Sequence, residues 1–379
     1  MLKEIYINNY RCMQNFSMKF TSSEAVVLLG LNGVGKSTFM SVFSLLQRLI
    51  CCDEKVEDVL KVSDFTLGNS ETPMRFTVRF DIKGQEFEYS LAFDMPSNFK
   101  RLRVFAESFS CGGKVVFERS LGQVTLHRDG HEAVRFIVDW HRVALPIIQY
   151  DSSVSPIAAF RHLLSNILIL SPSPDSIGSL VGDDGDILSC DCSNFVSWLD
   201  SLQRSDLRIG QRVVKLLQDT IYADLLSYGT VPGCDGNGPR LNLIFGDGVS
   251  VQKSLDFATL SDGEKCMFIY AAIAAKVEYM GCPLCLWDEP DNYLAVSEVR
   301  SFISRLRKSF KKDDCQLIVS SHNPEVIEAL PPDHVRVFMR DSHLEPVREK
   351  RLDDVLKMPE ERKHIRLLLL TGRLYDEEA

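Results

Sequence analysis

The sequence predicts an α/β fold in which a mixed sheet is combined with an antiparallel β meander and a helical insertion. Three observations predict this fold. The apolar run from Ala25 to Leu29 leads through a glycine-rich stretch into a helical apolar pattern over residues 39–50. Short alternating segments fill residues 74–127. The last third, from residue 265, alternates helix and strand patterns, which implies βαβ units with parallel strands.

The composition is that of an ordinary globular protein. Of the 379 residues, 45% are apolar and 25% are charged, which excludes disordered and collagen-like classes. Lys and Arg total 43 while Asp and Glu total 52, so the net charge of −9 restricts any nucleic-acid site to a local basic patch. The 11 cysteines are scattered, and the apolar runs fall far short of the ~20 residues of a membrane-spanning helix. We therefore expect a cytoplasmic protein without a transmembrane segment.

Four segments are expected along the chain. Residues 1–180 form an N-terminal part, which opens with a β-hairpin and contains the meander. Apolar residues from about Asn194 to Leu226 are spaced as in two helices. They lie between loops rich in Gly, Asp and Ser at residues 171–192 and 230–240, which predicts a helical insertion at residues 181–240. Residues 241–345 form the C-terminal part, and residues 346–379 form a charged tail.

A phosphate-binding loop is predicted at Gly30–Thr38. The segment fits G-x-x-x-x-G-K-[ST] and lies between a predicted strand and a predicted helix, which is the context that the motif requires. The glycines let backbone N–H groups turn toward the phosphates, Lys36 reaches the β- and γ-phosphates, and the Ser37 hydroxyl binds Mg²⁺. A glycine-rich turn without a ligand is the alternative, but the spacing, the Lys-Ser pair and the context all favour the site. The residues expected to bind nucleotide here are Asn32, Gly33, Gly35, Lys36, Ser37 and Thr38.

Two acids end the apolar strand predicted over residues 284–287. Acids at the carboxyl edge of a sheet meet ligands there, so Asp288 is expected to hold Mg²⁺. Glu289 is expected to take a proton from the attacking water or to orient that water. An acidic cap for the helix beginning near Ala295 is the alternative. The phosphate-binding loop elsewhere in the chain favours the catalytic interpretation.

Two further segments leave a functional and a structural interpretation open. The sequence L-S-D-G-E precedes a predicted helix, so Ser261 and Gly263 could form a second anion site at the helix N-terminus. The same residues also match an ordinary capping box with Glu264. His322 follows the strand predicted over residues 316–320 and could donate to the γ-phosphate, or could be a capping or surface residue.

The order of these motifs resembles that of the ABC-type ATPase head, with its Walker A, signature, Walker B and switch-histidine elements. The branch that the sequence resembles is that of the SMC, RecF and OLD ATPases, which includes stand-alone AAA-family ATPases of anti-phage defence systems such as Septu and PARIS. The opening segment Ile7–Arg11 is similar to the N-terminal hairpin of this branch, where the matching Arg lies near the nucleotide. The resemblance implies a P-loop ABC-ATPase head that binds ATP and Mg²⁺, hydrolyses ATP and dimerises on binding it, with Arg11 in the site.

The sequence departs from the family pattern in places. Asp262 and Glu264 stand in the signature where transporters carry Gly and Gln, a form that is frequent in this branch. Ala295 stands where relatives often carry His. The candidates for the magnesium-sensing Gln of the family are Gln85, Gln123 and Gln149.

The effector is expected to be encoded separately. About 40 residues follow Arg340, too few for the Toprim nuclease that OLD-type proteins attach after the head. The resemblance therefore implies a homodimer or higher even oligomer that regulates a separate nuclease or toxin subunit, in bacterial anti-phage defence. A RecF- or SMC-like DNA repair ATPase is the alternative. A subunit that energises a transporter is a further alternative. The N-terminal hairpin disfavours it, because this hairpin resembles that of the SMC, RecF and OLD branch.

A basic helix is predicted over residues 297–310. Six cations and no acid lie in the 13 residues from Arg300 to Lys312, opposite an apolar stripe. These cations could contact the phosphates of double-stranded DNA or an acidic effector subunit, or they could form a solvated face.

Overall fold

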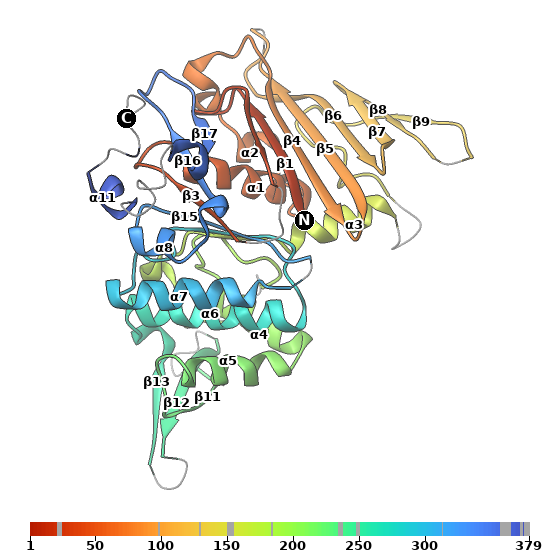
Figure 1. Ribbon diagram of the computed structural model, residues 1–379. Coiled ribbons are helices and arrows are strands. Elements are labelled where there is room, and N and C mark those ends of the chain that lie inside the picture. The colour runs from red at the N-terminus through yellow and green to blue at the C-terminus, as the bar shows by residue number, and fades with distance from the viewer. Residues whose placement is uncertain are drawn as a thin grey trace. The chain divides into compact units, whose positions relative to one another are not determined.

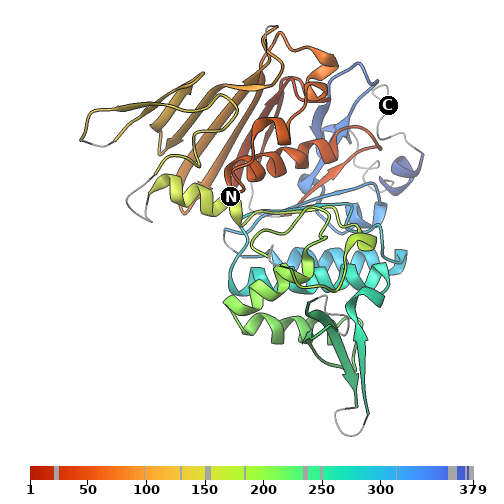
Figure 2. The same cartoon turned by 180° about the vertical axis from the view of Figure 1, so that it is seen from behind.

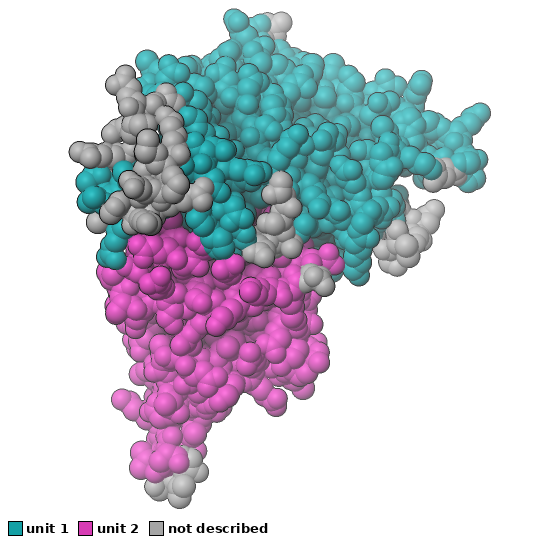
Figure 3. Space-filling model, viewed as in Figure 1, with its two compact units in different colours: residues 1–167, 331–379 teal, residues 168–330 magenta. Residues whose placement is uncertain are grey.

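The computed structural model divides into two compact units, which are coloured separately in Figure 3. Unit 1 contains residues 1–167 and 331–379, and unit 2 contains residues 168–330. The residues that the structure describes are 1–20, 25–97, 99–128, 130–149, 155–182, 185–233, 238–247, 251–312, 314–356, 365–371 and 374.

An antiparallel sheet in unit 1 combines the opening hairpin with the meander (Figure 1). In spatial order, its strands are β2 (Phe16–Lys19), β1 (Leu2–Asn8), β4 (Met74–Ile82), β5 (Gln85–Asp94), β6 (Arg103–Cys111), β7 (Lys114–Ser120), β8 (Gln123–Leu126) and β9 (Val134–Ile137). The predicted hairpin and meander are therefore confirmed. Strand β9 lies beyond the residues for which the sequence predicts strands.

One face of the meander packs against helix α3 (Pro156–Ser165). Alternation along the strands places Phe80, Phe87 and Phe109 in the core. The ring of Phe160 lies 6.2, 6.4 and 5.0 Å from these three rings, measured between centroids. Figure 2 shows α3 along this face of the sheet. The helix is absent from the elements that the sequence predicts.

A second sheet of unit 1 carries the glycine-rich loop. Strands β3 (Val26–Leu29) and β16 (Val335–Met339) are parallel, whereas β16 and β17 (Arg348–Arg351) are antiparallel, so this sheet is mixed. All four residues of β3 are buried, as expected of a central strand. Helix α1 (Lys36–Ile50) follows the loop, and its Phe39 ring lies 6.2 Å from Phe16 and 6.0 Å from Phe338.

Short elements complete the described part of unit 1. They are the helices α2 (Val56–Val59), α9 (Leu352–Val355) and α11 (Ile365–Leu370), and the 3₁₀ turns η1 (Val62–Asp64), η2 (Thr66–Gly68) and η5 (Pro332–His334).

Unit 2 is built on parallel strands and helices. Strand β14 (Cys285–Asp288) pairs in parallel with β10 (Leu168–Leu170) and with β15 (Leu317–Ser321). The helices are α4 (Phe195–Ser205), α5 (Arg208–Gln218), α6 (Asp262–Tyr279), α7 (Val296–Ser309) and α8 (Pro324–Glu328), with 3₁₀ turns η3 (Pro174–Ser176) and η4 (Phe257–Thr259). The predicted alternation of helix and strand from residue 265 onward is confirmed, as are the two helices of the insertion.

An antiparallel sheet of unit 2 corrects one expectation. The second helix of the insertion was expected to extend to Leu226, with a loop over residues 230–240, but α5 ends at Gln218. Strands β11 (Leu225–Val231), β12 (Arg240–Gly246) and β13 (Gln252–Asp256) follow it. The residues of β13 are exposed or half-buried, so the strand lacks the apolar alternation that would predict it. Within the described ranges, no helix is both long and apolar enough to cross a membrane.

Candidate active site

Close packing around the phosphate-binding loop requires glycine at two positions. A Cβ atom at Gly35 would lie 2.8 Å from Cys12 Sγ and 2.9 Å from Val347 Cγ2, and one at Gly30 would lie 2.7 Å from the carbonyl oxygen of Phe338. The φ angle of Gly35 is 109°, which residues with a side chain rarely adopt. The backbone of the loop can therefore be held in this path only by glycine.

The first turn of α1 is suited to an anion. Its N-cap, Gly35, offers no side-chain cap, and this turn, which is described throughout, contains no acidic residue. The N–H groups and the dipole of the helix are therefore directed at the loop. Lys36 is 5% exposed, and its Nζ donates to the carbonyl oxygens of Gly30 at 2.6 Å and Leu31 at 3.1 Å. Of the other residues predicted to bind nucleotide in this loop, Asn32, Gly33 and Ser37 are exposed and Thr38 is half-buried.

Arg11 is on the turn between β1 and β2. The residue after it, Cys12, is the one that approaches Gly35 of the loop. The Arg11 N–H donates to the carbonyl oxygen of Asp64 at 2.6 Å, and Arg11 Nε donates to Asp64 Oδ1 at 2.9 Å. The hydroxyl of Tyr10 lies 3.1 Å from Ser41 Oγ on α1. The Arg11 side chain is 46% exposed, so Asp64 orients the guanidinium without covering it.

Glu289, the predicted catalytic base, has an unusual backbone conformation. Its φ angle is 45°, in a region that residues other than glycine rarely occupy. The Glu289 N–H donates to Ser320 Oγ at 3.0 Å, its carboxylate accepts from Asn292 Nδ2 at 2.8 Å, and its Oε1 lies 3.2 Å from His322 Nδ1. Such a conformation persists only where surrounding contacts hold it, and it is common at functional sites. The structure thus brings two predicted site residues, Glu289 and His322, together.

The carboxylates beside Glu289 are oriented by hydroxyl groups at the end of β15. Ser320 donates to Asp288, which stands opposite it in the paired strands, and Ser321 Oγ donates to Asp291 Oδ1 at 2.9 Å. Asp288 is half-buried and Ser37 is exposed, and both offer the oxygen donors that Mg²⁺ prefers. Each of the two residues, taken by itself, has the donor chemistry of a Mg²⁺ ligand, and their sharing one ion stays a prediction. Among the described residues, no group of three or more His, Cys, Asp or Glu side chains could hold a metal ion.

The signature segment forms the capping box that was one of its two interpretations. Ser261 Oγ donates to Glu264 Oε2 at 2.7 Å, the Ser261 N–H donates to the same oxygen at 2.8 Å, and the Glu264 N–H donates back to Ser261 Oγ at 3.4 Å. A Cβ at Gly263 would lie 2.9 Å from the carbonyl oxygen of Tyr293, so glycine permits a close approach there. Ser261 is exposed, and the box is therefore compatible with an anion site, which stays a prediction.

Glu264→Gln is expected to reduce stability at neutral pH but not at acid pH. Although burial acts to raise it, hydrogen bonds from Ser261 hold the pKa of Glu264 below its ordinary value. A carboxyl with a lowered pKa in the folded state contributes stability above its unfolded pKa of about 4.3, and loses it as pH falls through the folded pKa. The difference in Tm between wild type and variant should therefore shrink from pH 7 to pH values below about 4. A difference that stays constant, or that also appears for the exposed Glu118→Gln, would contradict this assignment.

Two ATPase family models match separate parts of the sequence. One, described as an AAA ATPase domain, matches residues 1–109, which contain the phosphate-binding loop. The other, described as an AAA domain, putative AbiEii toxin, Type IV TA system, matches residues 200–328, which contain Ser261, Glu289 and His322. No curated protein matches the sequence.

Solved structures of SMC heads share the fold. A crystal structure of an SMC head bound to the C-winged helix domain of ScpA is 14% identical and has a TM-score of 0.54, over 94% of this chain and 99% of that one. An SMC head with an extended coiled coil, bound to the C-terminal domain of ScpA from Pyrococcus furiosus, is 13% identical and has a TM-score of 0.52, over 96% and 99%. The chain therefore has the α/β fold of an SMC-type ATPase head, as the motif order implies. Together with the two family matches, this fold supports an ATPase that binds nucleotide.

Three residues of the site are absent from the sequence prediction. Ser320 donates to Asp288 and accepts from the Glu289 N–H. Its place at the end of the strand predicted before His322 was a sequence signal for this role. Asn292 follows the two acids by a few residues, so its position also offered a signal. Asp64 offered none, since nothing in the sequence connects it to the hairpin.

Proposed function

We propose that this chain is a cytoplasmic ABC-type ATPase that hydrolyses ATP, dimerises on binding it and regulates a separate effector in bacterial anti-phage defence. The observation that carries the ATPase is the arrangement at the end of β14, where Glu289 is held beside His322 and Asn292 and directly follows Asp288. A chain that also contains a phosphate-binding loop has the parts that phosphoryl transfer to water needs.

Each residue has a specific role in the proposed reaction. Lys36 and the N–H groups of the loop bind the phosphates. Glu289 accepts a proton from the attacking water or orients that water, and His322, whose Nδ1 faces Glu289, donates from Nε2 to the γ-phosphate. Mg²⁺, held by Ser37 and Asp288 when bound, supplies a positive charge that stabilises the phosphate oxygens. The nucleotide-binding set is Arg11, Asn32, Gly33, Gly35, Lys36, Ser37 and Thr38, with Ser261 and Gly263 from a second subunit.

The proposed active site is shared between two subunits. One chain carries two helix N-termini with exposed residues. The first turn of α1 contains no acid, whereas that of α6 contains Asp262 and Glu264 beside the exposed Ser261. If Ser261 and Gly263 of one subunit bind the γ-phosphate held by the loop of the other, the same two surfaces meet twice. A two-fold homodimer with two nucleotides follows from this pairing.

Mixing Lys36→Ala with Ser261→Arg subunits is expected to restore ATPase activity that neither variant has alone. A heterodimer of the two contains one site in which both residues are intact, so random mixing should recover roughly a quarter of wild-type activity. Phosphate release at equal subunit concentrations measures this recovery. The matched control is the double variant mixed with either single variant, which contains no intact site. If the mixture is no more active than the single variants, the shared site is wrong.

Two observations bear on the role of the ATPase. The description of the family model that matches residues 200–328 names a putative toxin of a toxin–antitoxin system, and this supports an effector-linked role in defence. The fold shared with SMC heads supports the second candidate, a RecF- or SMC-like DNA repair ATPase. The gene that adjoins this one separates the two: a nuclease or toxin gene supports defence, and a recombination gene supports repair.

A further inference from the structure

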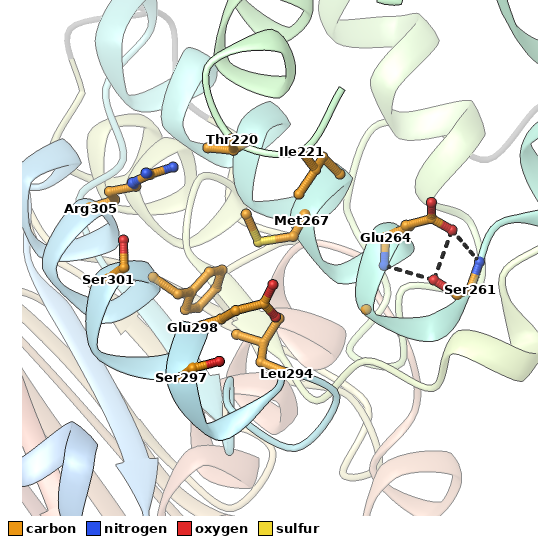
Figure 4. A pocket seen from close by; sticks show the side chains of 12 residues that line it. Thr220, Ile221, Ser261, Glu264, Met267, Leu294, Ser297, Glu298, Ser301 and Arg305 are labelled. Atoms are coloured by element: carbon orange, nitrogen blue, oxygen red, sulfur yellow. Dashed lines mark hydrogen bonds between the residues drawn. The ribbon is translucent and has the colours of Figure 1, made fainter. Parts of the chain in front are cut away.

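A groove in unit 2 runs along one side of α7. It consists of two adjoining hollows, of about 370 Å³ and about 650 Å³, which share Thr220 and Arg305 in their walls. Figure 4 shows the first hollow from close by, with Met267 and Ile221 facing side chains of α7. We call the two hollows together the α7 groove.

The two hollows differ in chemistry. The first has apolar residues in its lining, which are Ile221, Met267, Leu294 and Phe302. The second has cations in its lining, which are Arg212, Arg305, Lys308, Lys311 and Lys312. The first hollow also has Glu264, Glu298 and Arg305 in its lining, and the second also has Leu216, Tyr270 and Ala274, so the cluster of cations is what distinguishes the second hollow. An apolar group with negative charge beside it therefore complements the groove.

The acids in the second hollow are already paired. Glu278 Oε2 accepts from Arg212 Nε at 2.7 Å, Asp219 pairs with Lys215 at 3.0 Å, and Lys312 donates to backbone carbonyls of α6. Among the described residues, no carboxylate lies within salt-bridge distance of the remaining cations, which are Arg305, Lys308 and Lys311. These three positive charges therefore have no neutralising partner in the described part of unit 2.

An acidic peptide segment matches this arrangement better than double-stranded DNA does. An apolar hollow of this volume accepts an anchoring side chain, which a phosphate backbone lacks. Arg305 and Lys308 are three residues apart on α7 and so are neighbours on its surface.

We propose that the α7 groove docks an acidic segment of the effector, with an apolar side chain in the first hollow and carboxylates against Arg305, Lys308 and Lys311. That the segment belongs to the effector rests on the proposed function, whereas the class of ligand follows from the groove alone. The basic face that the sequence predicts on this helix is thereby assigned to a protein partner.

Docking would be coupled to nucleotide binding. Ser261, Gly263 and Glu264 also line the first hollow, so a docked side chain contacts the segment proposed to bind the nucleotide of the second subunit. A contact shared by two ligands changes both affinities by the same factor. ATP-dependent pairing therefore alters the affinity for the acidic segment, and the segment alters the affinity for ATP.

The test measures binding of short fluorescein-labelled peptides to the full chain by fluorescence anisotropy. In these peptides one Leu or Phe is followed by several Glu, and a matched set has Gln in place of Glu. We expect the Glu peptides alone to bind, and Arg305→Glu/Lys308→Glu to weaken them about tenfold. Met267→Arg, which fills the first hollow with a charge, is expected to weaken them as well. The control is Arg204→Glu/Arg300→Glu, which has the same charge change at cations outside both hollows and should bind as wild type does.

Several results would overturn the proposal. Glu peptides that fail to bind, or that bind all variants equally, would exclude an acidic occupant. A DNA duplex that binds in place of the peptides, and is lost in Arg305→Glu/Lys308→Glu, would make the groove a nucleic-acid surface. ATPase activity is measured in parallel, because these residues lie outside the proposed catalytic set. If the wild-type chain hydrolyses ATP but binds no peptide, the docking site is wrong and the proposed ATPase stands. If it binds the peptides but does not hydrolyse ATP, the proposed function is wrong and the docking site stands.

Discussion

Glu289→Gln is expected to bind ATP as wild type does and to hydrolyse it about 10²–10⁴-fold more slowly. The amide has the size of the carboxylate and can still accept the hydrogen bond from Asn292, but it cannot take a proton from water. The phosphate-binding loop and Asp288 are unchanged, so the nucleotide still binds. The variant should therefore accumulate as an ATP-bound dimer.

The measurements are steady-state phosphate release, nucleotide affinity and the mass in solution with and without ATP. The matched control is Glu328→Gln, the same chemical change on the exposed surface of α8, which should leave turnover unchanged. Phosphate release close to that of wild type in Glu289→Gln would exclude this residue as the base. Loss of ATP binding would instead indicate that the substitution disturbs the turn in which the φ angle of Glu289 is 45°.

Arg119→Met is expected to destabilise unit 1 by about 3–5 kcal/mol. Arg119 is 3% exposed and lies 3.5 Å from Glu107, which is 2% exposed. The guanidinium also donates to three backbone carbonyls, which are those of Leu121, Asp139 and Arg142. Glu107 accepts from the Tyr89 hydroxyl at 2.9 Å and from the N–H groups of Ala144 and Leu145 at 2.7 and 3.0 Å. Removing Arg119 leaves a buried carboxylate without its counter-ion and three carbonyls without a donor.

Urea unfolding measures the loss. Burial raises the pKa of Glu107, and the neighbouring guanidinium opposes this rise, so the single variant should bury a carboxylate that is costly to ionise. Glu107→Leu/Arg119→Met removes both charges and should be less destabilised than the sum of the single variants. The control Arg101→Met breaks an exposed pair with Glu57 and is expected to cost at most about 1 kcal/mol. A free energy of unfolding for Arg119→Met equal to that of the control would show that the buried pair contributes nothing.

The local parts of the site could be predicted from the sequence. The conformation of the phosphate-binding loop depends on glycines at fixed spacing, and Gly33 and Gly35 have φ angles of 80° and 109° as such a loop requires. The buried strand before the loop could be predicted from its continuous run of apolar residues, and the helix after the loop from apolar residues at helical spacing. The meeting of Glu289 and His322 was also predictable, because the carboxyl ends of neighbouring parallel strands lie at one edge of a sheet.

Other features depend on contacts between residues far apart in the chain. Asp64 orients Arg11 from 53 residues away, and the Glu107–Arg119 pair is completed by backbone groups of residues 139–145. Strand β13 is polar and largely exposed, so its place in a sheet comes from backbone pairing with β12 and leaves no periodic signal. Backbone angles and the spacing of buried residues depend on residues that are close together in the chain, so they can be predicted from a single sequence. Ion pairs, strand partners and the α7 groove depend on which segments meet in three dimensions, and only the tertiary structure decides them.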